Sequence, residues 1–160
     1  MGCMVKRCEA EKILDPYRII LADDHVPLRR KLKSILGGVA GFEVIGEAGD
    51  GIELINLLNE KGLEPHIVLI DASMPNLSGI EAARAIKMNY PGIKVLILSV
   101  HEEREYLQQA FSAGAEGYLL KADADMELFT AIETVRQGGI YISPTFSGPA
   151  QKNEHRSGTE

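Results

Sequence analysis

The sequence has no tryptophan, only two cysteines in 160 residues, and few aromatic residues, at 6% of the composition. Cys3 and Cys8 lie in a polar leader with no second cysteine pair and no histidine at finger spacing, which argues against a structural zinc site. No apolar run reaches the roughly 18 residues that a membrane-spanning helix needs, and the start lacks a signal-peptide pattern. We therefore expect a cytoplasmic chain with no membrane partner.

Basic residues are also fewer than acidic ones: the sequence has 17 Lys and Arg and 23 Asp and Glu, which gives a net charge of −6. This balance argues against a broad nucleic-acid-binding surface, which is built from Lys and Arg. A hydrophobic content of 45% over this length suffices for one domain with its own core. We expect that domain at residues 17–144, between a flexible N-terminal arm at 1–16 and a disordered polar tail at 145–160.

Five apolar runs of strand length alternate with helical patterns along the domain. The third run, from Ile67 to Ile70, has no polar alternate, which is typical of a parallel strand covered by helices on both faces. The expected strands are 18–22, 42–48, 67–70, 94–98 and 117–120, and the expected helices are about 27–36, 52–62, 79–89, 102–113 and 123–137. Ser78 with Glu81 forms a capping-box pattern at the start of the third helix.

Short connections and right-handed crossovers favour a flavodoxin-like α/β fold. It is a doubly wound, five-stranded parallel sheet of order 2-1-3-4-5 with five helices and with strand five at the edge. Polar side chains follow four of the strands, and this order brings them to the same end of the sheet. These residues are Asp23 and Asp24 after strand one, Asp71 after strand three, Ser99 after strand four and Lys121 after strand five.

Three carboxylates at one place repel each other unless a cation lies among them. Hard oxygen ligands of this kind suit Mg²⁺, or Mn²⁺ in its place. With such an ion bound, Asp71 can act as a nucleophile on a phosphoryl group, while Ser99 and Lys121 contact the other phosphoryl oxygens. The sequence therefore predicts Mg²⁺-dependent formation of an acyl phosphate on Asp71.

These motifs resemble the receiver domain of response regulators, the phospho-acceptor half of two-component signalling, and the resemblance covers roughly residues 17–144. Within that family, several segments are similar to the receivers of LuxR/NarL-type transcription regulators. They are Leu21 to His25, Gly46 to Gly51, Leu98 to His101, Gly117 to Lys121 and Gly138 to Pro144.

The resemblance implies that a sensor histidine kinase or a phosphotransfer protein phosphorylates Asp71. It implies a metal site made by Asp23, Asp24, Asp71 and the main-chain carbonyl of Ser73. Ser99 and Tyr118 would be the switch pair, in which the hydroxyl moves towards the phosphoryl group and the ring turns inward. Ser73 and His101 would tune dephosphorylation. The chain would not be an enzyme beyond its own phosphoryl transfer and autodephosphorylation.

Two positions depart from the common receiver pattern. Ala122 replaces the proline that often follows the lysine, which leaves the isomer of the Lys121–Ala122 bond open, and Ala72 replaces a larger aliphatic residue. After Pro144 there is also no helix-turn-helix segment. The chain is therefore a stand-alone receiver that contacts a downstream protein, or the receiver of a longer regulator whose output domain is missing. In both cases we expect no DNA binding by this chain, and homodimerisation is left open.

Three other functions fit this sequence less well. A haloacid-dehalogenase-like phosphatase also uses an aspartyl nucleophile and Mg²⁺, but it needs a second Asp two residues after the first, where Ser73 stands. A flavodoxin-type flavin site needs a glycine- and hydroxyl-rich phosphate loop after strand one, where Asp23 and Asp24 would repel a phosphate. A pseudo-receiver scaffold is disfavoured because every phosphorylation residue is present.

Overall fold

Six parallel strands form one sheet in the order β2-β1-β3-β4-β5-β6. The computed structural model of this chain describes residues 15–147. The strands are β1 Tyr17–Ala22, β2 Phe42–Ala48, β3 Ile67–Asp71, β4 Lys94–Ser99, β5 Gly117–Leu120 and β6 Tyr141–Ile142.

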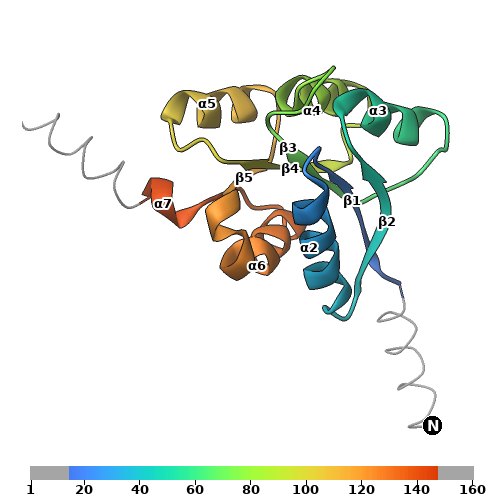
Figure 1. Cartoon of the computed structure of the whole chain (residues 1–160), viewed down its shortest axis with the longest axis horizontal. Coiled ribbons are helices and arrows are strands. Elements are labelled where there is room, and N and C mark those ends of the chain that lie inside the picture. The colour runs from blue at the N-terminus through green and yellow to red at the C-terminus, as the bar shows by residue number, and fades with distance from the viewer. Residues whose placement is uncertain (1–14, 148–160) are drawn as a thin grey trace, which may run out of the picture.

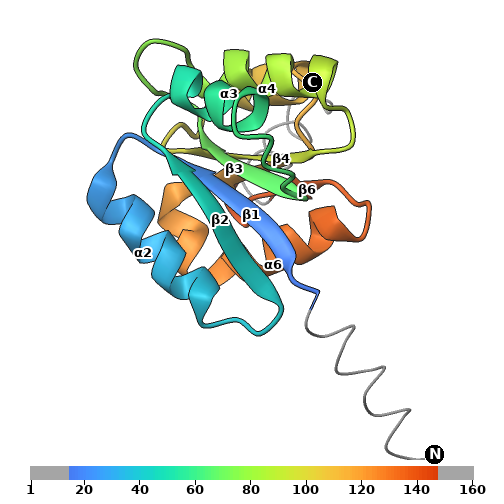
Figure 2. The same cartoon turned by 90° about the vertical axis from the view of Figure 1, so that its right-hand side faces the viewer.

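The helices form a layer on each face of this sheet, as Figures 1 and 2 show from two directions. One layer holds α3, α4 and α5, and the other holds α2 and α6. The helices are α2 Val26–Gly37, α3 Gly51–Asn59, α4 Gly79–Asn89, α5 Arg104–Ser112, α6 Ala124–Arg136 and the short α7 Pro144–Ser147, with a 3₁₀ turn η1 at Lys121–Asp123.

Each strand contributes to two cores because successive side chains point to opposite faces of a sheet. In β1, Ile20 packs beneath the α3–α5 layer, whereas its neighbours Ile19 and Leu21 pack beneath α2 and α6. The same alternation holds along β3, whose five residues are all buried. The unbroken apolar run of this strand is therefore explained by helices covering it on both sides.

Local signals set the start of α4 directly behind the end of β3. Ser78 caps the helix by accepting a hydrogen bond from the Glu81 main-chain nitrogen at 3.2 Å, as the capping-box pattern predicts. Gly79 lies so close to β3 that a Cβ atom on it would be 1.9 Å from the main-chain oxygen of Asp71. Only a residue without a side chain fits there, so the close packing of this turn fixes where Asp71 ends its strand.

The predicted strand order 2-1-3-4-5 is confirmed, but the expectation that strand five lies at the edge is wrong. β6 pairs with β5 and covers that edge, which makes six strands in place of five. A two-residue strand is too short to show the alternation from which strands are predicted. The last long helix begins at Ala124 rather than at Asp123, because η1 occupies residues 121–123.

The chain continues in helical form to residue 147 as α7, three residues past the expected domain end at 144. The remaining parts of the arm 1–16 and tail 145–160 that fall on 1–14 and 148–160 lie outside the described residues. Among residues 15–147, no helix has both the length and the apolar character needed to cross a membrane.

Candidate functional site

Carboxylates from two neighbouring strands meet at the carboxyl end of the sheet. Asp71 is the last residue of β3 and Asp23 directly follows β1, and these strands are paired in parallel. Both side chains are buried, whereas Asp24 next to them is exposed. The crevice beyond the strand ends of a doubly wound sheet is where such folds place their chemistry.

Lys121 joins the two buried carboxylates. Its Nζ lies 3.1 Å from Asp23 Oδ2 and 3.2 Å from Asp71 Oδ1. The lysine reaches this point from the first residue of η1, directly after β5. The structure thus brings together three of the predicted site residues that are far apart in the sequence.

Main-chain groups also hold the carboxylates. His25 donates its main-chain N–H to Asp23 Oδ1 at 2.8 Å, and Ser73 donates its main-chain N–H to Asp71 Oδ1 at 3.2 Å. Arg29 from α2 donates to the main-chain oxygen of Asp23 at 2.6 Å. Each carboxylate is therefore oriented by its own loop before any ligand is bound.

The electrostatics of the cluster favour a proton or a cation. Burial, together with the charge of Asp23, raises the pKa of Asp71 to about 6, although Lys121 acts in the opposite direction. A carboxyl group with a pKa near neutrality in this position is costly to ionise without a compensating positive charge. One lysine shared between two carboxylates does not supply enough of that charge.

The same residues fit a divalent cation. Asp23, Asp24 and Asp71 each offer an oxygen, and the three oxygens lie within 4.8 Å of one another. Asp23 Oδ2 is buried and accepts no hydrogen bond from the described residues, its contact with Lys121 being an ion pair by distance. A buried carboxylate oxygen that accepts no hydrogen bond, beside two other carboxylates, is the kind of ligand set that a hard cation such as Mg²⁺ prefers.

We expect Asp71→Asn to stabilise the protein at pH 7 when EDTA removes divalent ions. The folded-state pKa of about 6 lies above the unfolded value of 3.8, so the protonated carboxyl stabilises the fold below pH 4. That contribution, on the order of 2 kcal/mol, is lost as the pH rises through 6. Urea unfolding of wild type and variant at pH 4 and pH 7 measures it. A difference between the two proteins that is the same at both pH values would contradict the raised pKa.

Ser99 and Tyr118, the predicted switch pair, lie on adjacent strands. Ser99 ends β4 and is buried, and its Oγ accepts the main-chain N–H of His101 at 3.0 Å. Tyr118 in β5 is fully buried, and its hydroxyl donates to the main-chain oxygen of His101 at 2.8 Å. Burial raises the pKa of this phenol. His101 therefore connects the two residues through its main chain.

The side chain of His101 extends towards the loop after Asp71. Its ring stacks on Tyr106 of α5 with centroids 3.9 Å apart, and its Nε2 lies 3.4 Å from Ser73 Oγ. The structure thus brings Ser73 and His101 together. The bond between Lys121 and Ala122 is trans, as are all peptide bonds of residues 15–147.

Arg29, Ser143 and Phe146 also contribute to this site, although no sequence pattern marks them. Arg29 supports the loop of Asp23. Ser143 is fully buried beside η1, and Phe146 packs edge-on against Tyr118 with ring centroids 5.4 Å apart. Only the position of Ser143 in the segment Gly138 to Pro144, which is typical of LuxR/NarL-type receivers, could have drawn attention to it.

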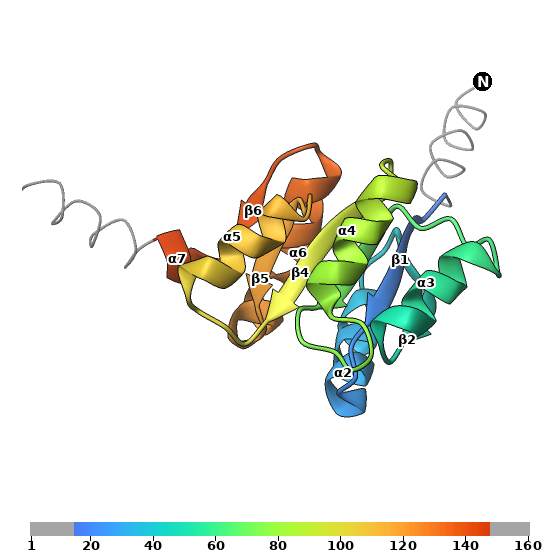
Figure 3. The ribbon, with the colours of Figure 1, turned by 90° about the horizontal axis from the view of Figure 1, so that it is seen from above.

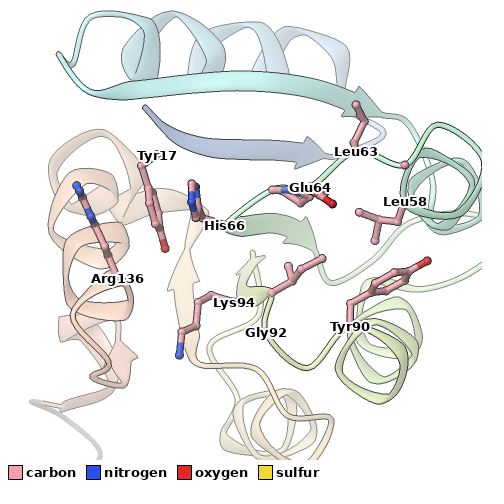
Figure 4. A pocket seen from close by; sticks show the side chains of 12 residues that line it. Tyr17, Leu58, Leu63, Glu64, His66, Tyr90, Gly92, Lys94 and Arg136 are labelled. Carbon is pink, nitrogen blue, oxygen red and sulfur yellow. The ribbon is translucent and has the colours of Figure 1, made fainter. Parts of the chain in front are cut away.

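A pocket of about 580 Å³ lies at the opposite end of the sheet, where β1, β3 and β4 begin. In Figure 4 the Tyr17 ring lies between the guanidinium of Arg136 and the ring of His66. Tyr17 stacks on His66 with centroids 4.8 Å apart, and the Arg136 guanidinium carbon is 4.9 Å from the Tyr17 ring. None of the acidic cluster lines this pocket, so it is separate from the site of Asp71.

The segment that holds this acidic cluster matches a known protein family. The family model described as "Response regulator receiver domain" matches residues 19–133, which include Asp23, Asp71 and Lys121. The chain belongs to this receiver family. Receiver domains are the signalling modules of two-component systems, and the family is generally not enzymatic.

Relatives of this receiver domain are named as regulatory proteins, and some of them as transcriptional regulators. The transcriptional regulatory protein DegU of Brevibacillus brevis is 40% identical over 128 residues, which cover 79% of this chain and 53% of that protein. The oxygen regulatory protein NreC of Staphylococcus epidermidis is 36% identical over 126 residues, which cover 78% of this chain and 57% of that protein. The chain therefore spans a little over half the length of these curated relatives.

Solved structures place this receiver among LuxR-type regulators. The two-component response regulator of the LuxR family from Aurantimonas sp. SI85-9A1 is 32% identical, with a TM-score of 0.80, over 87% of this chain and 98% of that chain. The isolated receiver domain of RcsB from Salmonella enterica serovar Typhimurium, in the presence of the phosphomimetic BeF₃⁻, is 27% identical with a TM-score of 0.76, over 82% and 96% of the two chains. The predicted resemblance to LuxR/NarL-type receivers is confirmed.

Proposed function

We propose that Asp71 accepts a phosphoryl group from a sensor histidine kinase or a phosphotransfer protein. The observation that carries this proposal is the buried pair Asp23 and Asp71, joined by Lys121 at the carboxyl end of the sheet. An oxygen of Asp71 would form a bond to phosphorus while the bond to the donor breaks, and the donor would leave with that electron pair. The product is an acyl phosphate on Asp71.

The chain's own groups have separate tasks in this reaction. Lys121 provides a positive charge for the phosphoryl oxygens, and the Ser99 hydroxyl provides a hydrogen-bonding group. Asp23, Asp24, Asp71 and the main-chain carbonyl of Ser73 would hold Mg²⁺, or Mn²⁺, which would neutralise charge on the incoming anion. Hydrolysis of the acyl phosphate would return the chain to its first state, and Ser73 and His101 would tune the rate of that step.

The output of the modification is a change of contact surface. Ser99 would move towards the phosphoryl group, and the packing of Tyr118 would follow it. Such a switch needs only a few kcal/mol of differential contact between two states. The receiver would then act on a downstream protein or on an output domain of a longer regulator, since some of the relatives are named as transcriptional regulators. As predicted from the sequence, we expect this chain not to bind DNA and to lie in the cytoplasm, and we leave homodimerisation open.

Uptake of one phosphoryl group from acetyl phosphate tests the proposal directly. We expect intact-mass spectra to show a single added phosphoryl group when Mg²⁺ is present, and none in EDTA, because the acidic cluster repels an unscreened anion. Equal labelling in EDTA would show that the acidic cluster holds no ion needed for the reaction.

We expect the double variant Asp23→Asn with Asp24→Asn to lower the Mg²⁺ affinity by more than about tenfold, because two hard anionic ligands are lost. Titration calorimetry with Mg²⁺ is the measurement. The matched control is Glu43→Gln with Glu60→Gln, which changes the net charge equally at exposed positions away from the site. A similar loss of affinity in both double variants would mean that general electrostatics, not ligation, attracts the ion.

A further inference from the structure

The segment after α6 returns to the phosphoryl site. β6 pairs with β5, so that Tyr141 lies opposite Gly117 and Ile142 opposite Tyr118. Figure 3 shows β6 and α7 on the β5 side of the sheet, next to α5. The segment Tyr141–Ser147, which we call the exit segment, is therefore in position to contact the turn that carries Lys121.

Ser143 makes that contact with both ends of the turn. Its Oγ accepts the main-chain N–H of Leu120 at 3.0 Å and donates to Asp123 Oδ2 at 2.8 Å. Leu120 directly precedes η1, Lys121 is its first residue and Asp123 is its last. Ser143 is itself tied to β5, because its main-chain N–H donates to the Tyr118 oxygen at 2.9 Å. One buried hydroxyl thus holds the start and the end of η1.

These two hydrogen bonds of Ser143 matter because the position of the flexible Lys121 side chain depends on its backbone. Leu120 is 2% exposed and Ser143 is 0% exposed, so no water replaces the hydroxyl easily. Without it, the Leu120 N–H would be buried and unsatisfied, which is costly enough to shift the chain locally. A shift at Leu120 would move Lys121, whose Nζ has to stay within about 3 Å of its anionic partners to bind them.

We infer that Ser143 is a positioning residue for Lys121 and that it links the exit segment to occupancy of the phosphoryl site. This inference rests on the proposed function of Asp71 and Lys121. Phe146 adds a second contact of the same segment, because it packs edge-on against Tyr118. Linkage is reciprocal: an anion bound at Lys121 orders η1 and so stabilises the docked exit segment, and loss of that docking weakens anion binding.

Binding of BeF₃⁻ in the presence of Mg²⁺, followed by fluorine NMR, tests the inference on the whole chain. We expect Ser143→Ala to weaken BeF₃⁻ binding about fivefold, the effect of one lost hydrogen bond. Mg²⁺ affinity without BeF₃⁻ should not fall, since Lys121 is not a metal ligand and its displacement takes a positive charge away from Asp23 and Asp71. Asp123→Ala, which removes the acceptor of Ser143 and Thr145 at the far end of η1, should weaken BeF₃⁻ binding in the same direction.

Two controls separate positioning from general destabilisation. Ile67→Val removes one buried methyl group at the start of β3, away from the site, and should leave BeF₃⁻ affinity unchanged. In a Lys121→Ala background, Ser143→Ala should have no further effect, because the residue that it positions is gone.

The inference would be wrong if Ser143→Ala lowered BeF₃⁻ affinity as much in the Lys121→Ala background as in the wild type. It would also be wrong if both Ser143→Ala and Asp123→Ala bound BeF₃⁻ with wild-type affinity. Neither result would affect the proposed function. Failure of the unmodified chain to bind BeF₃⁻ with Mg²⁺ would overturn the proposed function, and the inference with it.

Discussion

Asp71→Asn is expected to abolish the Mg²⁺-dependent uptake of a phosphoryl group from acetyl phosphate. The amide that replaces the carboxylate has no nucleophilic oxygen of comparable strength, and it also removes one anionic ligand of the cation site. Its size and its ability to accept the main-chain N–H of Ser73 are kept, so the loop should not rearrange. Intact-mass spectra after incubation with the donor measure the effect.

Asp125→Asn is a suitable control for this experiment. Asp125 is an exposed carboxylate at the start of α6, paired with Lys31 at 2.7 Å, and its replacement removes the same charge. This variant should be phosphorylated like the wild type. Undiminished phosphorylation of Asp71→Asn would place the acceptor elsewhere. If the wild type is labelled and neither variant is, the reaction would depend on total charge rather than on Asp71.

Gly79→Ala should lower the free energy of unfolding by about 3 kcal/mol, the upper part of the range for an overpacked position. The added methyl group would meet the main-chain oxygen of Asp71 at 1.9 Å and its carbonyl carbon at 2.7 Å. These are backbone atoms in the central strand, which cannot move aside as a flexible side chain does. Either α4 separates from β3 or the end of β3 is displaced. Urea unfolding in EDTA gives the change in free energy.

Gly37→Ala is the matched control, because a Cβ atom at Gly37 has no neighbour within 4 Å. At the last residue of α2, alanine is expected to be neutral or to stabilise by about 0.5 kcal/mol, since it restricts the unfolded chain. Similar destabilisation of both variants would show that glycine flexibility, rather than the contact with Asp71, is what position 79 requires.

The sequence was sufficient to predict the parts of this fold that are governed by local patterns. The run Ile67 to Ile70, followed by Asp71 and a capped helix at Ser78, predicted a central strand with a carboxylate at its end, and β3 and α4 lie there. Right-handed crossovers then limited the strand order to 2-1-3-4-5. With the order known, the proximity of Asp23, Asp71 and Lys121 followed from topology alone.

The parts that escaped prediction depend on contacts between distant residues. β6 has only two residues, Tyr141 and Ile142. It forms because these residues pair with the edge of β5, and no alternation of apolar and polar residues predicts it. The contacts of Ser143 with Leu120 and Asp123 span 23 and 20 residues. The support that Arg29 gives to Asp23 depends on how α2 packs, because a helical arginine more often extends into solvent.

The short strand β6 also affects whether the edge of the sheet can pair with a strand of another chain. At one edge of the sheet, the two residues of β6 offer too few main-chain groups to start pairing with a foreign strand. At the other edge, β2 shifts its register opposite Ile19 and Ile20 and carries Glu47, which forms ion pairs with Arg29 and Lys33. Bulges and charges of this kind hinder edge-to-edge pairing. Contacts between copies of this domain would therefore use helix faces rather than extension of the sheet.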